Sequence, residues 1–128
     1  MKIATFGVCM WLCASVCSAA SPFDGKWTGA FMRPAPAGNQ DVTLTLTIDQ
    51  GGRATGSATL QGVTGDIPIE WGYVKDDLIV VKIRAPFQQG TAVFVYMGKL
   101  TGDQIEFGRR PEDLSVGVLV KGTLKRAK

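Results

Sequence analysis

The strongest constraint on the fold is a strict alternation of apolar and polar side chains along residues 41–50. In the segment DVTLTLTIDQ, Val42, Leu44, Leu46 and Ile48 alternate with threonine and aspartate. Successive side chains of a β-strand point to opposite faces of the sheet. The spacing therefore predicts a strand that buries one face and exposes the other.

The segment that follows reads as the return strand of a hairpin. A three-residue loop at 50–52, containing two glycines, leads into residues 53–61. This loop length sets large inward residues opposite small ones: Ile48 faces Ala54, Leu46 faces Gly56 and Leu44 faces Ala58.

Two further hairpins follow the same logic. Residues 66–74 place Ile67, Ile69, Trp71 and Tyr73 on one face, and after a turn at 75–77 the inward residues are Ile79, Val81 and Ile83. On the outer side this register sets Glu70 against Lys82, a cross-strand pair of opposite charge. Gly102-Asp103 fits a two-residue primed turn, which sets Leu100 opposite Ile105 and Gly98 opposite Phe107, with Phe94 and Tyr96 pointing inward.

A first strand carrying Trp27, Gly29 and Phe31 and a last strand carrying Val116, Val118, Val120 and Leu124 complete a set of eight. We find no helical pattern, linker or second domain in residues 21–128, a length that suits one core. Consecutive hairpins with one apolar face each predict an all-β, eight-stranded antiparallel up-and-down barrel, which leaves no sheet edge exposed. A partly open sandwich is the alternative.

Residues 1–20 have the pattern of a signal peptide. Lys2 precedes an apolar run from Ile3 to Cys17, and small residues follow at 18–20. The run is too short to span a bilayer comfortably, so we expect an exported protein, periplasmic or extracellular, with no stable membrane insertion once the leader is removed. All three cysteines, Cys9, Cys13 and Cys17, lie in this leader. We interpret them as small apolar residues of the leader, the alternatives being a metal or haem cluster and lipid attachment at Cys17.

The opening FDGKWTG at 23–29 resembles the Gly-x-Trp start of lipocalins and the related opening of avidin-type barrels. More closely, the chain is similar to a group of small exported bacterial β-proteins. Their pattern is matched at Gly25–Gly29, Thr45–Gly56, Gly65–Ile69, Gly98–Phe107 and Lys121–Arg126. The resemblance implies a lipocalin-like or avidin-like meander and export, and it implies no activity. The second lipocalin signature is absent, and the last strand offers no clear arginine partner for Trp27.

Composition excludes most catalytic mechanisms. The chain has no histidine, and no cysteine after position 17, which removes Ser-His-Asp triads, cysteine nucleophiles and histidine-based zinc sites. Asp66 and Glu70 stand about 13 Å apart along one strand, too far for a glycosidase pair. Asp76 and Asp77 suit a turn better than a calcium site. We therefore expect no enzyme, metal or cofactor, and the mildly basic mature chain gives no nucleic-acid footprint. The basic cluster at 121–128, with Arg109 and Arg110 nearby, fits solvated strand ends better than a phosphate site.

Binding inside the barrel is the function that remains. An eight-stranded interior is either filled by side chains or able to hold one small ligand. We predict that a cavity, if present, takes a small apolar or aromatic ligand and is lined by Leu44, Leu46, Trp71, Tyr73, Phe94, Tyr96 and Phe107. The same residues packed into a solid core are the alternative.

A second hypothesis places the function on the outer wall, as a structural or protein-interaction module. Leu78, Val80, Val93, Val95 and Met97 are expected to point outward on adjoining strands, among Lys82, Arg84 and Lys99. A contiguous exposed apolar patch usually marks an interaction surface, here for a homodimer or another protein. Alternatively, the lysine and arginine stems cover it.

Overall fold

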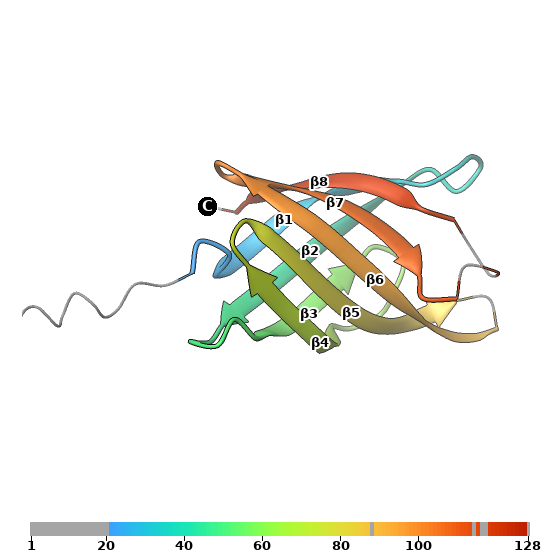
Figure 1. The fold of residues 1–128 in the computed structure, drawn as a ribbon. Helices are drawn as coiled ribbons and strands as arrows, with labels where there is room; N and C mark the ends of the chain where they lie inside the picture. Colours follow the sequence, from blue (N-terminus) through green and yellow to red (C-terminus); the bar gives the residue numbers. More distant parts are fainter. Residues whose placement is uncertain (1–20, 88, 114, 116–117, 128) are drawn as a thin grey trace, which may run out of the picture.

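The protein forms a closed barrel of eight antiparallel strands, in which each strand pairs with the next and β8 returns to β1 (Figure 1). The computed structural model describes residues 21–87, 89–113, 115 and 118–127. The strands are β1 (Gly25–Met32), β2 (Asn39–Ile48), β3 (Ala54–Leu60), β4 (Ile67–Lys75), β5 (Leu78–Phe87), β6 (Gly90–Thr101), β7 (Gln104–Pro111) and β8 (Val120–Arg126). The predicted fold class is confirmed. The predicted signal peptide, its three cysteines and Val116 lie outside the described residues.

Two of the predicted hairpin registers are confirmed. Strands β2 and β3 pair Ile48 with Ala54 and Leu44 with Ala58, as the three-residue loop requires. Strands β6 and β7 pair Leu100 with Ile105, and Gly102 in their turn has a φ of +63°. A primed turn needs a positive φ at this position, which glycine adopts without a steric penalty.

The hairpin of β4 and β5 departs from the predicted register. Ile69 pairs with Ile83 as expected, but a β-bulge follows and Trp71, instead of Glu70, pairs with Lys82. The turn contains two residues rather than three, with Asp76 at a φ of +56°. A shift of one residue moves every later side chain to the other face. Trp71 and Tyr73 are therefore on the outer surface, each 45% exposed, and their predicted inward orientation is wrong.

The predicted charge pair in this hairpin also changes. Glu70 accepts a hydrogen bond from Arg84 at 3.0 Å, and Lys82 pairs with Glu112 at 2.9 Å. Lys82 lies 5.7 Å from the centre of the Trp71 ring. The bulge thus replaces the predicted Glu70–Lys82 pair with two others on the same outer surface.

Packed apolar side chains fill the middle of the barrel. Fully buried members of this core include Phe31, Val42, Leu44, Val81, Ile83, Ile105 and Leu124. The inward Gly98 leaves no free volume, because a Cβ there would come within 2.7 Å of the Phe107 ring. Gly56, which was also expected to face inward, is exposed. Between its ends, the barrel is therefore solid.

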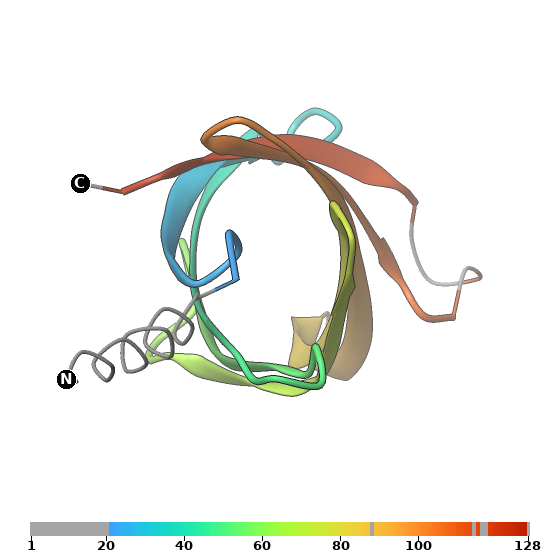
Figure 2. The same ribbon diagram turned by 60° about the vertical axis from the view of Figure 1, so that its left-hand side comes forward.

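One end of the barrel is closed by the segment that precedes β1. Figure 2 shows the blue segment that begins at residue 21 turning in over one side of this opening. Phe23 and Trp27 are fully buried there, and the Trp27 indole N–H donates to the Phe23 carbonyl at 3.0 Å. The adjacent carboxylate of Asp24 accepts a hydrogen bond from the amide of Ile48 at 2.6 Å. The segment is thereby joined to both β1 and β2.

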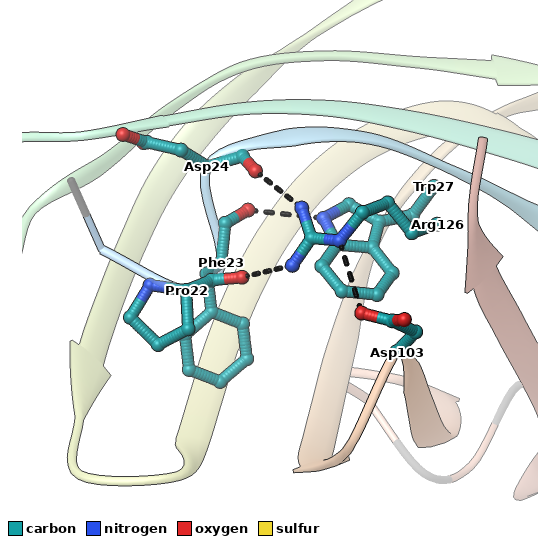
Figure 3. A network of polar contacts seen from close by, with 6 residues as sticks. All are labelled: Pro22, Phe23, Asp24, Trp27, Asp103 and Arg126. Atoms are coloured by element: carbon teal, nitrogen blue, oxygen red, sulfur yellow. Dashed lines mark hydrogen bonds and ion pairs between the residues drawn. The ribbon is translucent and has the colours of Figure 1, made fainter. Parts of the chain in front are cut away.

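Arg126 fastens the closed end from the last strand (Figure 3). Its guanidinium carbon lies 4.3 Å from the centre of the Trp27 ring, and it donates hydrogen bonds to the carbonyls of Asp24 and Pro22 at 2.9 and 2.6 Å. A cation over an indole face is an attractive arrangement. The expectation that Trp27 lacks an arginine partner is therefore wrong, because Trp27 and Arg126 are directly paired between β1 and β8.

The last strand is shorter than the alternation predicted. It begins at Val120, and Val118 lies before it with 60% of its surface exposed. Within the described residues, no helix is long and apolar enough to cross a membrane.

Candidate functional site

A cavity of about 270 Å³ occupies the end of the barrel opposite the closed one. It lies where the loops after β1, β3, β5 and β7 meet, and it opens to solvent between them. Most of its wall is apolar and comes from Pro34, Ala37, Leu60, Val63, Ala85, Pro86, Phe87, Phe94, Pro111, Val118 and Val120. The barrel is thus a cup, with a closed base, a solid middle and a hollow mouth.

Arg109 is the polar centre of this cavity. It lies on β7, pairs with Tyr96 of β6 and Val120 of β8, and is only 8% exposed. Its Nη1 donates to Oε1 of Gln40 at 2.7 Å and, over a longer 3.4 Å, to the hydroxyl of Tyr96. Gln40 is held in turn, because its Nε2 donates to the Gln61 carbonyl at 3.0 Å.

Three aromatic rings lie close to the guanidinium of Arg109. Its central carbon lies 4.7 Å from the centre of the Phe31 ring, 5.8 Å from that of Tyr96 and 6.0 Å from that of Phe94. The faces of aromatic rings carry partial negative charge and attract a cation. These rings offset part of the cost of burying the charge without neutralising it.

No carboxylate of a described residue forms an ion pair with Arg109. The ion pairs in the described part of the chain involve Lys82, Arg84, Lys99 and Arg126 instead. Among the described residues, the cavity wall contains a second arginine, Arg33, and no aspartate or glutamate. Since Arg33 donates only to the loop carbonyls of Gly38 and Ala37, the cavity carries uncompensated positive charge.

Tyr96 connects the cavity to the core. Its ring contacts those of Phe31 and Phe107 edge-on, with centres 5.4 and 6.2 Å apart. Burial raises the pKa of the Tyr96 hydroxyl, and the charge of Arg109 and its hydrogen bond oppose this only in part. The hydroxyl is therefore neutral at physiological pH and keeps a proton that it can donate.

The structure distributes the seven predicted lining residues over three places. Phe94 and Tyr96 line the cavity. Leu44, Leu46 and Phe107 are buried in the solid core below it. The last two, Trp71 and Tyr73, lie outside the barrel because of the bulge in β4. A packed core and a cavity, the two alternatives for the interior, thus each describe one part of it.

Sequence reasoning missed Arg109 and Gln40, and expected only tyrosine hydroxyls and indole N–H groups to orient a ligand. The signal for Arg109 was present in the confirmed register of β6 and β7. Extending the pairs Leu100–Ile105 and Gly98–Phe107 by one more inward position sets Arg109 opposite Tyr96. The same extension applies to Gln40, which lies two positions before Val42 on the buried face of β2, although a glutamine at the start of a strand is usually exposed.

The apolar patch predicted on the outer wall is partly exposed. Leu78 and Met97 are 52% and 42% exposed, Val80 and Val93 are half-buried, and Val95 is buried at 4%. Val95 is covered because Lys82 and Glu112 lie on either side of β6 and their ion pair crosses that strand. Trp71 and Tyr73 add aromatic surface that the prediction had assigned to the interior.

Among the described residues, no three histidine, cysteine, aspartate or glutamate side chains come together as a metal site would require. Within the cavity, the groups able to form polar contacts are the guanidinium groups, the Gln40 amide and the Tyr96 hydroxyl. These groups can orient a ligand through hydrogen bonds.

Two solved structures resemble the barrel. The redesigned beta barrel mFAP1, bound to DFHBI, is 17% identical, with a TM-score of 0.54 over 82% of this chain and 95% of that chain. The redesigned beta barrel mFAP0, also bound to DFHBI, is 18% identical, with a TM-score of 0.54 over 83% of this chain and 100% of that chain. At this identity the likeness supports the antiparallel barrel fold alone. No protein-family model and no curated protein matches the chain, so the resemblance to the group of small exported bacterial β-proteins stays a prediction.

Proposed function

We propose that the protein is a non-catalytic binding protein that takes one small, largely apolar molecule into the open end of its barrel. The observation that carries this proposal is the mostly apolar 270 Å³ cavity, which reaches into one end of the barrel as far as the buried Tyr96 and Arg109. Ligand sites are typically concave and mostly apolar, with a few placed polar groups. The two solved barrels of similar fold are each bound to a small molecule, which is compatible with this use.

The chemistry of the wall supports binding over catalysis. The described residues of the wall include no carboxylate, thiol, imidazole or lysine amine, the side chains that most often serve as general bases or nucleophiles. Tyr96, with its raised pKa, is a poor base near neutral pH. The signal-peptide pattern of residues 1–20 favours action after export, in the periplasm or outside the cell.

A variant that blocks the cavity tests the proposal. Val63 is half-buried in the cavity wall, on the loop after β3, so Val63→Trp fills the mouth with little demand on the core. Val80→Trp adds the same side chain on the outer surface and is the matched control. Calorimetric titration with small aromatic compounds is expected to give saturable binding to the parent and to Val80→Trp, and none to Val63→Trp. Equal binding to both variants would place the ligand elsewhere and contradict the proposal.

The outer surface supports a second candidate function, assembly with a second copy of this chain. Tyr73, Val80 and Met97 form one continuous row across β4, β5 and β6, and the row continues to Gly108 of β7, against which Leu119 packs. This row, together with Trp71 and Leu78, is the outer apolar face. Contiguous exposed apolar surface of this kind often marks an interaction site.

Charges at the edge of the outer apolar face fit a second copy. Arg84 with Glu70 and Lys99 with Asp77 place both signs beside it. A two-fold axis through the face would bring the acidic groups of one copy to the basic groups of the other. Sedimentation of the parent and Met97→Glu tests this: a dimer that Met97→Glu dissociates supports it, and a monomeric parent at high concentration rules it out.

A further inference from the structure

The strongest unassigned feature of the cavity is the charge of Arg109, which is buried and has no acidic partner among the described residues. A buried charge is costly unless it is paired with an opposite charge or fully hydrogen-bonded. Its described hydrogen bonds use Nη1 alone and go to two neutral groups, Gln40 and Tyr96. Nε and Nη2 have no acceptor among the described residues, where no unpaired side-chain nitrogen is sealed from solvent, so both remain accessible to a ligand.

From this arrangement we propose that the ligand is a small monocarboxylate with an apolar or aromatic body, whose carboxylate binds Arg109 and whose body fills the mouth of the cup. This proposal rests on the proposed function and names the ligand class of the same cavity. It assigns the positive charge of the cavity a partner that the described part of the chain does not supply.

The geometry of the cation favours a carboxylate. A guanidinium presents its N–H groups in a planar fork that matches the two oxygens of a carboxylate. The hydroxyl of Tyr96 lies 3.4 Å from Nη1 and can donate its proton to the same anion. Of the two arginines in the wall, only Arg109 is buried, and Arg33 is partly exposed near the opening. One buried arginine suits one negative charge, because the second charge of a dianion would have no buried partner.

The rest of the wall determines the body of the ligand. Phe87 and Phe94 stand edge-to-face at 5.5 Å in the cavity wall and, with Leu60 and Val63, offer a largely apolar surface. A volume of 270 Å³ equals that of about nine water molecules in the liquid, or a ligand of roughly ten non-hydrogen atoms. This size fits an aryl carboxylate or a medium-chain fatty acid better than a long lipid.

The position of Arg109 also orients the ligand. The guanidinium lies against Phe31, which is fully buried in the core, so the charged end of the ligand points inward. Arg33 stands in the wall beside the loop after β1 and attracts anions toward the opening. The apolar end then lies among the loops, where Phe87 and Val118 are.

Calorimetric titration with matched charged and neutral compounds tests the proposal. The probes are 2-naphthoate and octanoate, each paired with its amide, which has a similar shape and no charge. The parent protein is expected to bind each carboxylate at least about tenfold more tightly than its amide, since one charge-assisted hydrogen bond supplies this much. Arg109→Met is expected to lose this preference, and Arg109→Lys, which keeps the charge without the fork, to retain part of it.

Arg110→Met is the matched control, because Arg110 is adjacent in sequence and points to the outer side of β7. It is expected to keep the full preference for carboxylates. Tyr96→Phe, which removes one donor and conserves the ring, is expected to weaken the preference, and it keeps the test decisive if Arg109→Met fails to fold.

The outcomes separate this proposal from the proposed function. Equal affinity of the parent for carboxylates and amides overturns the carboxylate and leaves a neutral-ligand site standing. A preference that survives in Arg109→Met, or disappears in Arg110→Met, assigns the anion to the surface and overturns the role of Arg109. If no compound binds saturably, the proposed function fails and the carboxylate with it.

Discussion

Arg126 holds the closed end of the barrel, and its replacement by methionine measures how strongly. The substitution keeps an unbranched side chain and removes the guanidinium that donates to the Asp24 and Pro22 carbonyls and covers the Trp27 ring. Its contact with Asp103, whose side chain is 87% exposed, contributes little because surface ion pairs are weak. The cost therefore comes from two charge-assisted hydrogen bonds and one cation–π contact.

The magnitude follows from these three contacts. A hydrogen bond with a charged donor contributes about 1.5–3 kcal/mol, and a cation–π contact about 0.5–2 kcal/mol. The Arg126 side chain is 35% exposed, so water competes for the donors and the low end of each range applies. Since methionine retains much of the packing of the arginine stem, these contacts alone set the cost, and we expect the free energy of unfolding to fall by about 3–4 kcal/mol.

Urea unfolding followed by far-ultraviolet circular dichroism is the assay, with Lys125→Met as the control. Lys125 is the preceding residue of β8 and is exposed, so its replacement is expected to change stability by no more than about 0.5 kcal/mol. Equal unfolding midpoints for the two variants would refute the account of the closed end. Because the cavity lies at the opposite end, Arg126→Met is also expected to leave ligand affinity unchanged.

Three further predictions concern Gly56 in β3, the bulge in β4 and the hydroxyl of Tyr96. Gly56→Ala is expected to lower the free energy of unfolding by more than about 3 kcal/mol, because its Cβ would meet the Thr45 carbonyl and its φ is +134°. Gly62→Ala, which has open space around it, is expected to lower it by only about 1–2 kcal/mol. Similar urea unfolding midpoints for the two variants would contradict this. In a chain that begins at residue 21, iodide is expected to quench the fluorescence of the exposed Trp71 and not that of the buried Trp27. Trp71→Phe is expected to remove the quenchable emission, and a variant quenched as strongly as the parent would place Trp71 inside the barrel. Because burial raises the pKa of Tyr96, its unfolded form ionises first, and stability is expected to fall as the pH rises above about 10. Tyr96→Phe should show a smaller fall, and parallel curves for the two proteins would contradict the raised pKa.

The strands and most of their pairing could be predicted from the sequence because alternation and loop length constrain each other. Residues 42–48 alternate without interruption, and a three-residue loop then fixes which side chains face each other. The turn after β4 was ambiguous, since Lys75-Asp76-Asp77 fits a loop of two or three residues. No residue at 69–71 has a sequence pattern that indicates a bulge, although a glycine at position 72, which is buried, is consistent with one.

The candidate site was harder to predict than the fold. Its position depends on which end of the barrel is closed, and this is decided by residues 21–24 folding back over Trp27, a tertiary contact without a local pattern. The cavity itself is the volume that the loops leave unfilled. The inward position of Arg109 could have been predicted by extending the pairing of β6 and β7. Its place beside a basic sequence cluster instead favoured an exposed surface role.

Nuclear magnetic resonance during titration with 2-naphthoate tests most directly whether the open end of the barrel binds a carboxylate through Arg109. Saturable shifts are expected for the Arg109 Nε–H signal and for the methyl signals of Leu60, Val63 and Val120, which surround the cavity. The indole N–H of Trp71, on the outer apolar face, is expected to stay in place. Shifts confined to Trp71 and its neighbours, with the Arg109 signal unchanged, would contradict the account.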